Sequence, residues 1–393
     1  METKKTNYPV STPKVMWVNI IFFAITTFGG LIGGPLYVYR YGFSWGLFAL
    51  FAFYMIATGL SITVGYHRHF SHAAFRTNRF IQFLMLFFGA AAFEQTAYKW
   101  SAQHRDHHQH VDTDKDPYSI KKGFWYAHIG WLMFWDHESN YANAKDLEKN
   151  SLVMHQNNHY LLWSLGAGVV TPVLIGALMG QALGAFIFAV CLRITFVYHS
   201  TFFINSICHM FGKSTYDIYS TAKDHWFIAF LTYGEGYHNF HHRFPSDYRN
   251  AVRWYQWDPS KWVIAGLEKL GLASHLSRVS DFSILNARLS AENQRAKDKL
   301  AQTDSGESQI EHALEILKGQ YVAVRGYLSQ WEVATREYKT LMANRVSHKS
   351  EELLHTAADN LEKAKSQFVS AYENWKKLRE LKEVELFRRL LAL

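Results

Sequence analysis

Residues 43–72 read FSWGLFALFAFYMIATGLSITVGYHRHFSH, an apolar run that ends in three histidines. The part from Phe43 to Tyr66 is long and apolar enough to cross a bilayer as a helix, which takes about 20 residues. With three further windows of this kind, the predicted membrane spans are residues 15–39, 43–66, 160–179 and 182–203. The sequence therefore predicts an all-α integral membrane fold with four transmembrane helices and a histidine cluster at the end of a span.

The charged residues are unevenly distributed around these spans. The turns inside the two predicted hairpins, at residues 40–41 and 180–181, carry almost no charge, whereas the N-terminus and the stretches 67–159 and 204–280 are rich in Lys and Arg. The positive-inside rule places these charged parts on the cytoplasmic face. We therefore expect a membrane domain over residues 1–280, with stretches 67–159 and 204–280 forming a cytosolic helical cap.

Two segments outside the spans are also predicted to be helical. The apolar stretch Phe80–Phe93 is short, and a crossing there would separate the histidines on either side of it, so we expect an interfacial or buried helix. Residues 281–393 form a polar extension with apolar residues at helical spacing, and breaks near 303–308 and 347–350 predict three helices in a hairpin or coiled coil. This extension is expected to pack on the cap, dimerise or dock an electron donor.

The charge and the cysteines exclude two other classes of protein. The net charge of +8 does not indicate a nucleic-acid partner, because the basic residues form no recognisable reader motif and share the chain with membrane spans. Attraction to anionic lipid or to a phosphorylated substrate explains this charge better. The two cysteines, Cys191 and Cys208, have no partners at metal-binding spacing and are expected in the core.

Histidines gather in four tight groups at the ends of apolar segments: HRHFSH (67–72), HRDHH (104–108), NSICH (205–209) and HNFHH (238–242). In a helix, residues three and four apart share a face, so the three histidines of HRDHH are expected to converge on one point, as are the three of HNFHH. His67 and His72 are five apart and diverge on a regular helix, so the backbone must unwind for both to bind a metal. On spacing alone, His69 and His72 are the rival pair.

The number of histidines indicates two metal ions rather than one. Neutral imidazole binds iron, copper, zinc and nickel, so the ligand type does not select the metal. Nine histidines exceed the capacity of a single ion but suit two ions with four or five nitrogen ligands each. Two redox-active metals can store the electrons that O2 activation needs, and such centres attack unactivated C–H bonds. A metal carrier without catalysis is the alternative, although its ligands are expected inside the spans rather than at their ends.

These motifs, together with GEGYHNFHHRFPSDYR (234–249), give the chain a pattern over about residues 15–270 that resembles the membrane fatty acyl desaturases related to stearoyl-CoA desaturase. The resemblance implies metal ligation by nine histidines, with Asn205 acting through a water molecule. The implied ligands are His67, His72, His104, His107, His108, His209, His238, His241 and His242.

The resemblance also implies a narrow, kinked tunnel for the acyl chain. Trp100 and Thr201 match positions near its bend, and Glu94 stands where the animal enzymes carry a neutral amide. After His128-Ile129-Gly130-Trp131 those enzymes have a basic pair that contacts CoA, whereas this chain has Trp135 and Asp136. Basic candidates for a phosphate contact are Lys121 and Lys122, which also read as ordinary surface lysines.

The implied activity is O2-dependent desaturation by a di-iron centre. By resemblance, the enzyme introduces a cis delta-9 double bond into a long-chain saturated acyl-CoA, while acyl chains of phospholipids and a related di-iron hydroxylase are the alternatives. The chain shows no haem, flavin or nucleotide motif, so electrons are expected from a ferredoxin, a cytochrome b5 or a reductase. The expected location is a bacterial inner membrane, with the active site facing the cytoplasm.

Overall fold

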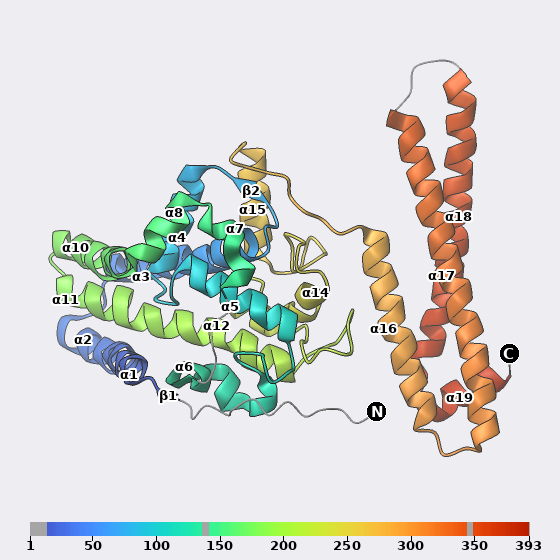
Figure 1. The fold of residues 1–393 in the computed structure, drawn as a ribbon, viewed down its shortest axis with the longest axis horizontal. Coiled ribbons are helices and arrows are strands. Elements are labelled where there is room, and N and C mark those ends of the chain that lie inside the picture. The colour runs from blue at the N-terminus through green and yellow to red at the C-terminus, as the bar shows by residue number, and fades with distance from the viewer. Residues whose placement is uncertain (1–13, 136–140, 344–348, 393) are drawn as a thin grey trace. The chain divides into compact units, whose positions relative to one another are not determined.

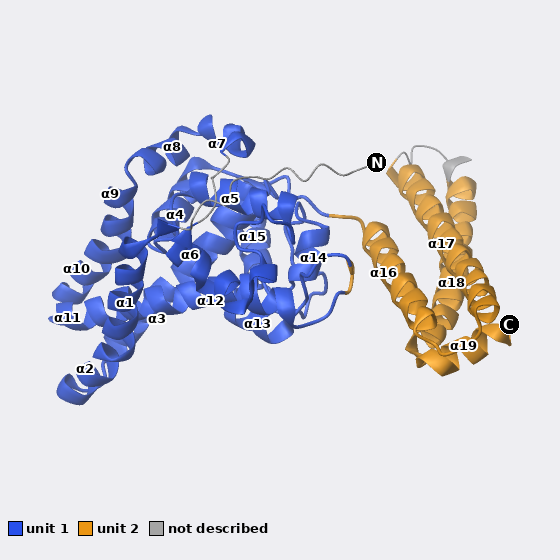
Figure 2. Cartoon of the chain, turned by 60° about the horizontal axis from the view of Figure 1, so that its bottom comes forward, with its two compact units in different colours: residues 1–214, 219–278 blue, residues 215–218, 279–393 orange. Residues whose placement is uncertain are grey.

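The computed structural model describes residues 14–135, 141–343 and 349–392. The chain forms two compact units, residues 1–214 with 219–278 and residues 215–218 with 279–393 (Figure 2). Helices dominate both units, as predicted, and the first unit adds two short antiparallel sheets within the described residues. β1 (Lys14–Val15) pairs with β3 (Phe134–Trp135), and β2 (Arg76–Thr77) pairs with β4 (Ala273–Ser274).

Among the described residues, four helices are long and apolar enough to cross a membrane, in agreement with the four predicted spans: Trp17–Tyr41, Trp45–Ser71, Tyr160–Leu178 and Ala182–Met210 (Figure 1). Each helix consists of consecutive segments. The first span comprises α1 (Trp17–Leu31) and α2 (Gly33–Tyr41), and the second comprises α3 (Trp45–Leu60) and η1 (Ser61–Ser71). The third comprises α9 (Tyr160–Leu165), η5 (Gly166–Val170) and α10 (Thr171–Leu178), and the fourth comprises α11 (Ala182–Ala185), η6 (Phe186–Leu192) and α12 (Arg193–Met210). The second and fourth helices run past their predicted ends at Tyr66 and Phe203, because their polar histidine segments stay helical.

The segment η1 is a π-helix, in which backbone hydrogen bonds connect residues five apart. The N–H of His72 donates to the carbonyl of His67 over 3.1 Å and continues this pattern by one residue. A wider helical turn therefore takes the place of the unwinding predicted between these two histidines. It brings side chains five apart to one side of the helix, and π-helical turns of this kind are frequent at functional sites.

Shorter helices surround the ends of the spans. They are α4 (Arg79–Ala90), α5 (Ala97–His110), η2 (Ile120–Lys122), η3 (Tyr126–Gly130), α6 (Trp131–Met133), η4 (Ala142–Ala144), α7 (Lys145–Glu148), α8 (Ser151–Asn158), α13 (Trp226–Leu231), α14 (His238–Arg243) and α15 (Pro259–Lys269). The predicted Phe80–Phe93 helix is α4, whose 12 residues are too few to cross a bilayer. One hydrophobic cluster joins η1, α4, α5, α8 and α15, so two of the elements that carry histidines, η1 and α5, share a packed core.

A buried arginine fixes the loop that follows α4. Arg193 is fully buried in the fourth span, and its guanidinium donates to the carbonyls of Ala91 and Gly168. A charged side chain inside a membrane span is stabilised by such carbonyl contacts. Arg193 therefore connects the fourth span to the third span and to the start of the loop that leads into α5.

In its described residues, the second unit is a bundle of four helices: α16 (Asp281–Ala301), α17 (Glu307–Ala343), α18 (Lys349–Glu380) and α19 (Glu383–Leu391). The sequence predicted three, and α19 was missed because no Gly or Pro marks the turn before it. The buried Glu292 carboxylate accepts from Trp375 Nε1 over 3.0 Å and from Arg288 Nε over 2.9 Å, and it also contacts Arg379. The unit therefore has its own hydrophobic core with one buried ionic cluster.

Candidate metal centre and cavity

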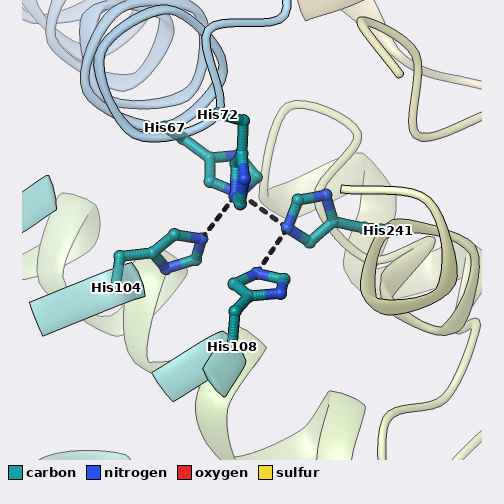
Figure 3. A group of neighbouring side chains, drawn as sticks. All are labelled: His67, His72, His104, His108 and His241. Carbon is teal, nitrogen blue, oxygen red and sulfur yellow. Dashed lines mark hydrogen bonds between the residues drawn. The ribbon is translucent and has the colours of Figure 1, made fainter. Parts of the chain in front are cut away.

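The first group of histidines contains five imidazoles from three elements: His67, His72, His104, His108 and His241 (Figure 3). Their potential ligand atoms lie within 4.8 Å of one another. The Nε2 atoms of His67 and His241 are 2.9 Å apart, and the same distance separates those of His72 and His104. Nitrogen lone pairs from η1, α5 and α14 therefore meet at one point.

The second group contains four imidazoles: His107, His209, His238 and His242. His209 lies near the end of α12, and its Nε2 is 3.0 Å from that of His238. The Nε2 atoms of His242 and His238 are 2.9 Å apart, and those of His107 and His242 are 3.3 Å apart. The structure thus brings together all nine histidines that the resemblance singled out, in one set of five and one set of four.

The helices α5 and α14 each serve both groups, so the prediction that each triplet converges on one point is wrong. On α5, His104 and His108 belong to the first group and His107 to the second. On α14, His238 and His242 belong to the second group and His241 to the first. A pair four residues apart lies almost in line along a helix, while the residue between them points to the side, so each helix supplies ligands in two directions.

Oxygen atoms outside the two groups orient several of the rings. His67 Nδ1 lies 2.8 Å from Glu235 Oε2, and His107 Nδ1 lies 2.8 Å from Asp116 Oδ1. Partners on Nδ1 turn the Nε2 atom toward the group, which is the usual arrangement of metal-binding histidines. Sequence reasoning missed both carboxylates, although Glu235 stands three residues before His238 and Asp116 follows the HRDHH motif closely.

His209 is held by a longer chain of hydrogen bonds. Its Nδ1 is 2.7 Å from the Thr221 hydroxyl, which in turn donates to Asp112 Oδ1 over 2.6 Å. Asp112 Oδ2 accepts from the Thr221 backbone N–H as well. The buried Nδ1 atoms of His238 and His67 both lack a partner with hydrogen-bond geometry within the described part of the chain, but that of His67 lies 2.8 Å from the Glu235 carboxylate.

The electrostatic setting favours neutral imidazoles. Burial and neighbouring imidazoles hold the pKa of His104, His108 and His241 well below the ordinary histidine value. Burial alone acts to raise the pKa of Glu235, but His67 and Arg68 outweigh it and lower this pKa to about 2. A set of neutral nitrogen donors beside an ionised carboxylate fits a cationic metal.

The donor set therefore fits two metal ions, one for each group of histidines. Within each group, the Nε2 atoms face one another with little room for protons between them. Their lone pairs repel each other unless a cation lies at the centre of the group and accepts them. His69 lies outside both groups, since its Nδ1 is 3.0 Å from the carbonyl of Phe75. Asn205 lines the cavity beside the second group, and its contact through water stays a prediction.

A cavity of about 420 Å³ opens beside these histidines, a size within the usual range for small-molecule sites. Its walls include His67, His104, His107 and His238 and extend between the membrane spans. Among them are the three residues predicted near the bend, Glu94, Trp100 and Thr201. Lys121 and Lys122 do not line the cavity, and Asp136 lies outside the described residues.

Glu94 joins two walls of this cavity. Trp100 Nε1 donates to its Oε2 over 3.2 Å, and Thr201 Oγ1 donates to its Oε1 over 2.8 Å. The Trp100 ring also stacks on His104, with centroids 4.9 Å apart. Burial raises the pKa of Glu94 to about 7, although both hydrogen bonds act to lower it.

The backbone around Glu94 is strained. Phe93 and Gln95 have φ angles of 60° and 73°, in the left-handed region that residues other than glycine rarely occupy. Such conformations persist only where the surrounding structure imposes them, and they concentrate at functional sites. Glu94 is therefore held between two constrained residues at the side of the cavity.

Comparison with known proteins shows to which family the chain belongs. Residues 43–272 match the family model for fatty acid desaturases. The chain belongs to the fatty acid desaturase family. This confirms the resemblance, and all nine histidines of the two groups lie inside the matched residues.

The relatives include enzymes named for two different acyl carriers. The chain is 41% identical over 234 residues to a probable acyl-CoA desaturase of Schizosaccharomyces pombe, covering 59% of this chain and 49% of that protein. It is 35% identical over 303 residues to acyl-CoA desaturase 1 of Saccharomyces cerevisiae, covering 72% of this chain and 59% of that protein. An sn-1 stearoyl-lipid 9-desaturase of Anabaena variabilis is 33% identical over 270 residues, covering 67% of this chain and 94% of that desaturase. The chain therefore spans about half the length of the first of these relatives and nearly all of the third.

Proposed function

We propose that this protein is an O2-dependent fatty acyl desaturase that introduces a cis delta-9 double bond into a long-chain saturated acyl group. The observation that carries this proposal is the opening of both histidine groups onto one cavity between the membrane spans. Relatives named as 9-desaturases support the position of the bond. Acyl-CoA, the carrier implied by the sequence resemblance, and a lipid ester both occur in the names of these relatives.

Two iron ions are the proposed cofactor. The five histidines of the first group would hold one ion, and the four of the second group would hold the other, with Asn205 acting through water. When bound, the iron pair supplies the O2 activation that removes hydrogen from an unactivated C–H bond. Glu235 and Asp116 keep the Nε2 atoms of His67 and His107 directed at the ions by holding their Nδ1 atoms.

The overall reaction requires an external source of electrons. A saturated –CH2–CH2– segment and O2, with two electrons and two protons, give –CH=CH– and two molecules of water. We expect a ferredoxin, a cytochrome b5 or a reductase to supply the electrons, since the chain shows no haem, flavin or nucleotide motif. The position of attack depends on the cavity walls, because a saturated chain offers no polar group by which it can be oriented.

Trp100, Thr201 and Glu94 are the proposed walls at the point of attack. They are connected by hydrogen bonds, and Trp100 also contacts the ring of His104. A rigid wall in contact with a metal ligand fixes the distance between one carbon pair and the metals. Lys121 and Lys122 stay predicted phosphate contacts; Lys121 Nζ donates to the carbonyl of Asp112 and Lys122 Nζ to the hydroxyl of Tyr126.

We also propose that the site faces the cytoplasm. The spans form two hairpins, so the starts of the first and third spans and the ends of the second and fourth lie on one side of the membrane. The segments on that side are rich in Lys and Arg, which the positive-inside rule assigns to the cytoplasm. A bacterial inner membrane stays a prediction from the sequence.

Alanine variants of His104 and His241 test the proposal, with His69→Ala as the matched control. We expect the first two to lose desaturation and to retain less iron, because both rings belong to the first group. His69→Ala should keep both, since His69 belongs to neither group. The readouts are iron content of the purified protein and mass spectrometry of lipids from an expressing host, which also distinguishes a double bond from a hydroxyl group. Unchanged product in the His104 and His241 variants contradicts the assignment.

A further inference from the structure

The cavity has an apolar mouth at the surface of the membrane spans. Three of its lining residues are largely exposed: Val18 at 79%, Leu161 at 70% and Leu165 at 48%. Val18 lies in the first turn of the first span, while Leu161 and Leu165 lie in the first two turns of the third span. Because these exposed apolar side chains lie on candidate membrane spans and also line the cavity, they mark an apolar opening on the surface of the spans.

The mouth lies on the same side of the membrane as the histidines. The first and third spans begin where the second and fourth end, and those ends carry His67 and His209. The opening is therefore near the boundary between headgroups and acyl chains rather than at the bilayer centre. A lipid of that leaflet has its ester groups at this depth and its acyl chains directed inward.

Both edges of the mouth are fixed to the polar part of the first unit. Asn19, next to Val18, donates from its side-chain amide to the carbonyl of Leu132 over 2.8 Å. On the opposite edge, the hydroxyl of Tyr160 accepts from the N–H of Gln95 over 3.2 Å. The Val18 side and the Leu161 side are thus anchored by separate hydrogen bonds, and the second anchor adjoins Glu94 at the wall of the cavity.

The polar lining suits an ester better than a chain of phosphates. Among the described residues that line the cavity there is no Lys or Arg, whereas phosphate recognition relies on these side chains. The polar residues that line the cavity include the neutral amides Asn19, next to Val18, and Gln95, which contacts Tyr160, as well as Gln103. Neutral amides donate hydrogen bonds to ester carbonyls and leave the charge of a phosphate uncompensated.

We propose that the acyl chain enters the cavity sideways from the bilayer between the first turns of the first and third spans, as part of a membrane glycerolipid. The inference rests on the proposed desaturase function and adds the carrier and the route. The chain passes Val18 and Leu161, reaches the wall of Trp100 and Thr201, and leaves its ester near the amides at the mouth.

The test uses the full-length, iron-loaded protein in phosphatidylcholine vesicles. One preparation contains phosphatidylcholine with a photoreactive diazirine on its acyl chain, and a second contains an acyl-CoA with the same group. We expect the glycerolipid probe to label the peptide that contains Trp100. Tryptophan at Val18 or Leu161 should fill the mouth and reduce this labelling by about tenfold. Ile21→Trp and Leu174→Trp are the matched controls, because both residues are exposed on the same spans at 54% and 59% and do not line the cavity.

A parallel measurement of turnover separates the route from the reaction. Perdeuterated stearoyl groups are supplied as phosphatidylcholine or as stearoyl-CoA, with a reductase and its electron carrier, and the labelled product is located by mass spectrometry. Product in the glycerolipid, reduced by Val18→Trp and Leu161→Trp, supports the proposal. The proposal is overturned if the labelled product is found only in the thioester. It is also overturned if neither Val18→Trp nor Leu161→Trp reduces the labelling of the Trp100 peptide. If neither substrate is desaturated, the desaturase function fails, while the labelling still decides the route.

Discussion

The carboxylate of Asp116 lies 2.8 Å from Nδ1 of His107, and both side chains are almost fully buried. Burial acts to raise the pKa of Asp116, but His107 outweighs it and the pKa lies below its ordinary value. The ionised carboxylate fixes the orientation of the His107 ring and directs Nε2 to the second group of histidines. The HRDHH motif therefore contains a histidine whose orientation depends on a carboxylate outside the motif.

The Asp116→Asn variant should bind iron less tightly. Loss of a carboxylate partner on a metal-binding histidine typically weakens metal affinity by about 10 to 100 fold. Titration of the iron-free protein with Fe²⁺, followed by iron analysis, measures this change. Asp146→Asn is the control, because Asp146 pairs with Arg105 at an exposed position. Equal affinities in the two variants contradict a role for Asp116 in orienting His107.

Stability should depend on pH through Glu94. A carboxyl group with a raised native pKa stabilises the fold in its protonated form, so this contribution is complete below the unfolded pKa near 4.5 and is lost as the pH rises through about 7. The loss amounts to about 3 kcal/mol at most. Glu94→Gln should remove this decline and be the more stable form at high pH. Thermal unfolding in detergent from about pH 5 to about pH 8 measures the difference. Parallel melting curves for both proteins would show that Glu94 does not titrate in this range.

Gly59 should not tolerate a side chain. A Cβ atom there would overlap the ring of Tyr233, whose hydroxyl donates to the carbonyl of Met55 over 2.9 Å. We expect Gly59→Ala to lower the free energy of unfolding by about 1 to 3 kcal/mol and to shift the position of the double bond, since Gly59 and Tyr233 both line the cavity. Gly166→Ala in the third span is the control, because its Cβ would meet open space. Denaturation curves and product analysis give the two readouts, and an unaltered protein in both would contradict the overlap.

The second unit should depend on Glu292. Glu292→Gln leaves Arg288 and Arg379 without their buried carboxylate, which typically costs about 3 kcal/mol or more. Hydrogen exchange of peptides from α16 and α18 should therefore become faster. Glu332→Gln, which breaks an exposed pair with Arg336, should change the exchange little, because such pairs contribute below about 1 kcal/mol. Exchange that is equally slow in both variants would show that the buried cluster does not stabilise the unit.

The spans and the histidine motifs could be predicted because each depends on residues close together in the sequence. A window of apolar residues is enough to indicate a spanning helix, since the bilayer requires every backbone group to bond within its own segment. The four predicted windows differ from the observed helices mainly at their ends, where η1 continues to Ser71 and α12 to Met210. There, polar sequence stays helical because other elements of the first unit bury it.

The choice between His67 and His69 illustrates what local spacing leaves open. Spacing alone favours His69 with His72, yet the π-helix turns His67 toward His72 and directs His69 to the carbonyl of Phe75. A π-helical turn has no sequence signature as simple as an apolar period. The resemblance to known desaturases, rather than the spacing, identified His67.

The sequence by itself determined that this chain is a helical membrane protein with histidine motifs at the ends of its spans, because hydropathy and motif spacing act over short distances. Only the tertiary structure decided how α5 and α14 divide their histidines between two groups, which carboxylates hold them, and which residues line the cavity beside them. The two groups depend on residues more than a hundred positions apart, such as His67 with His241, and packing alone brings these together.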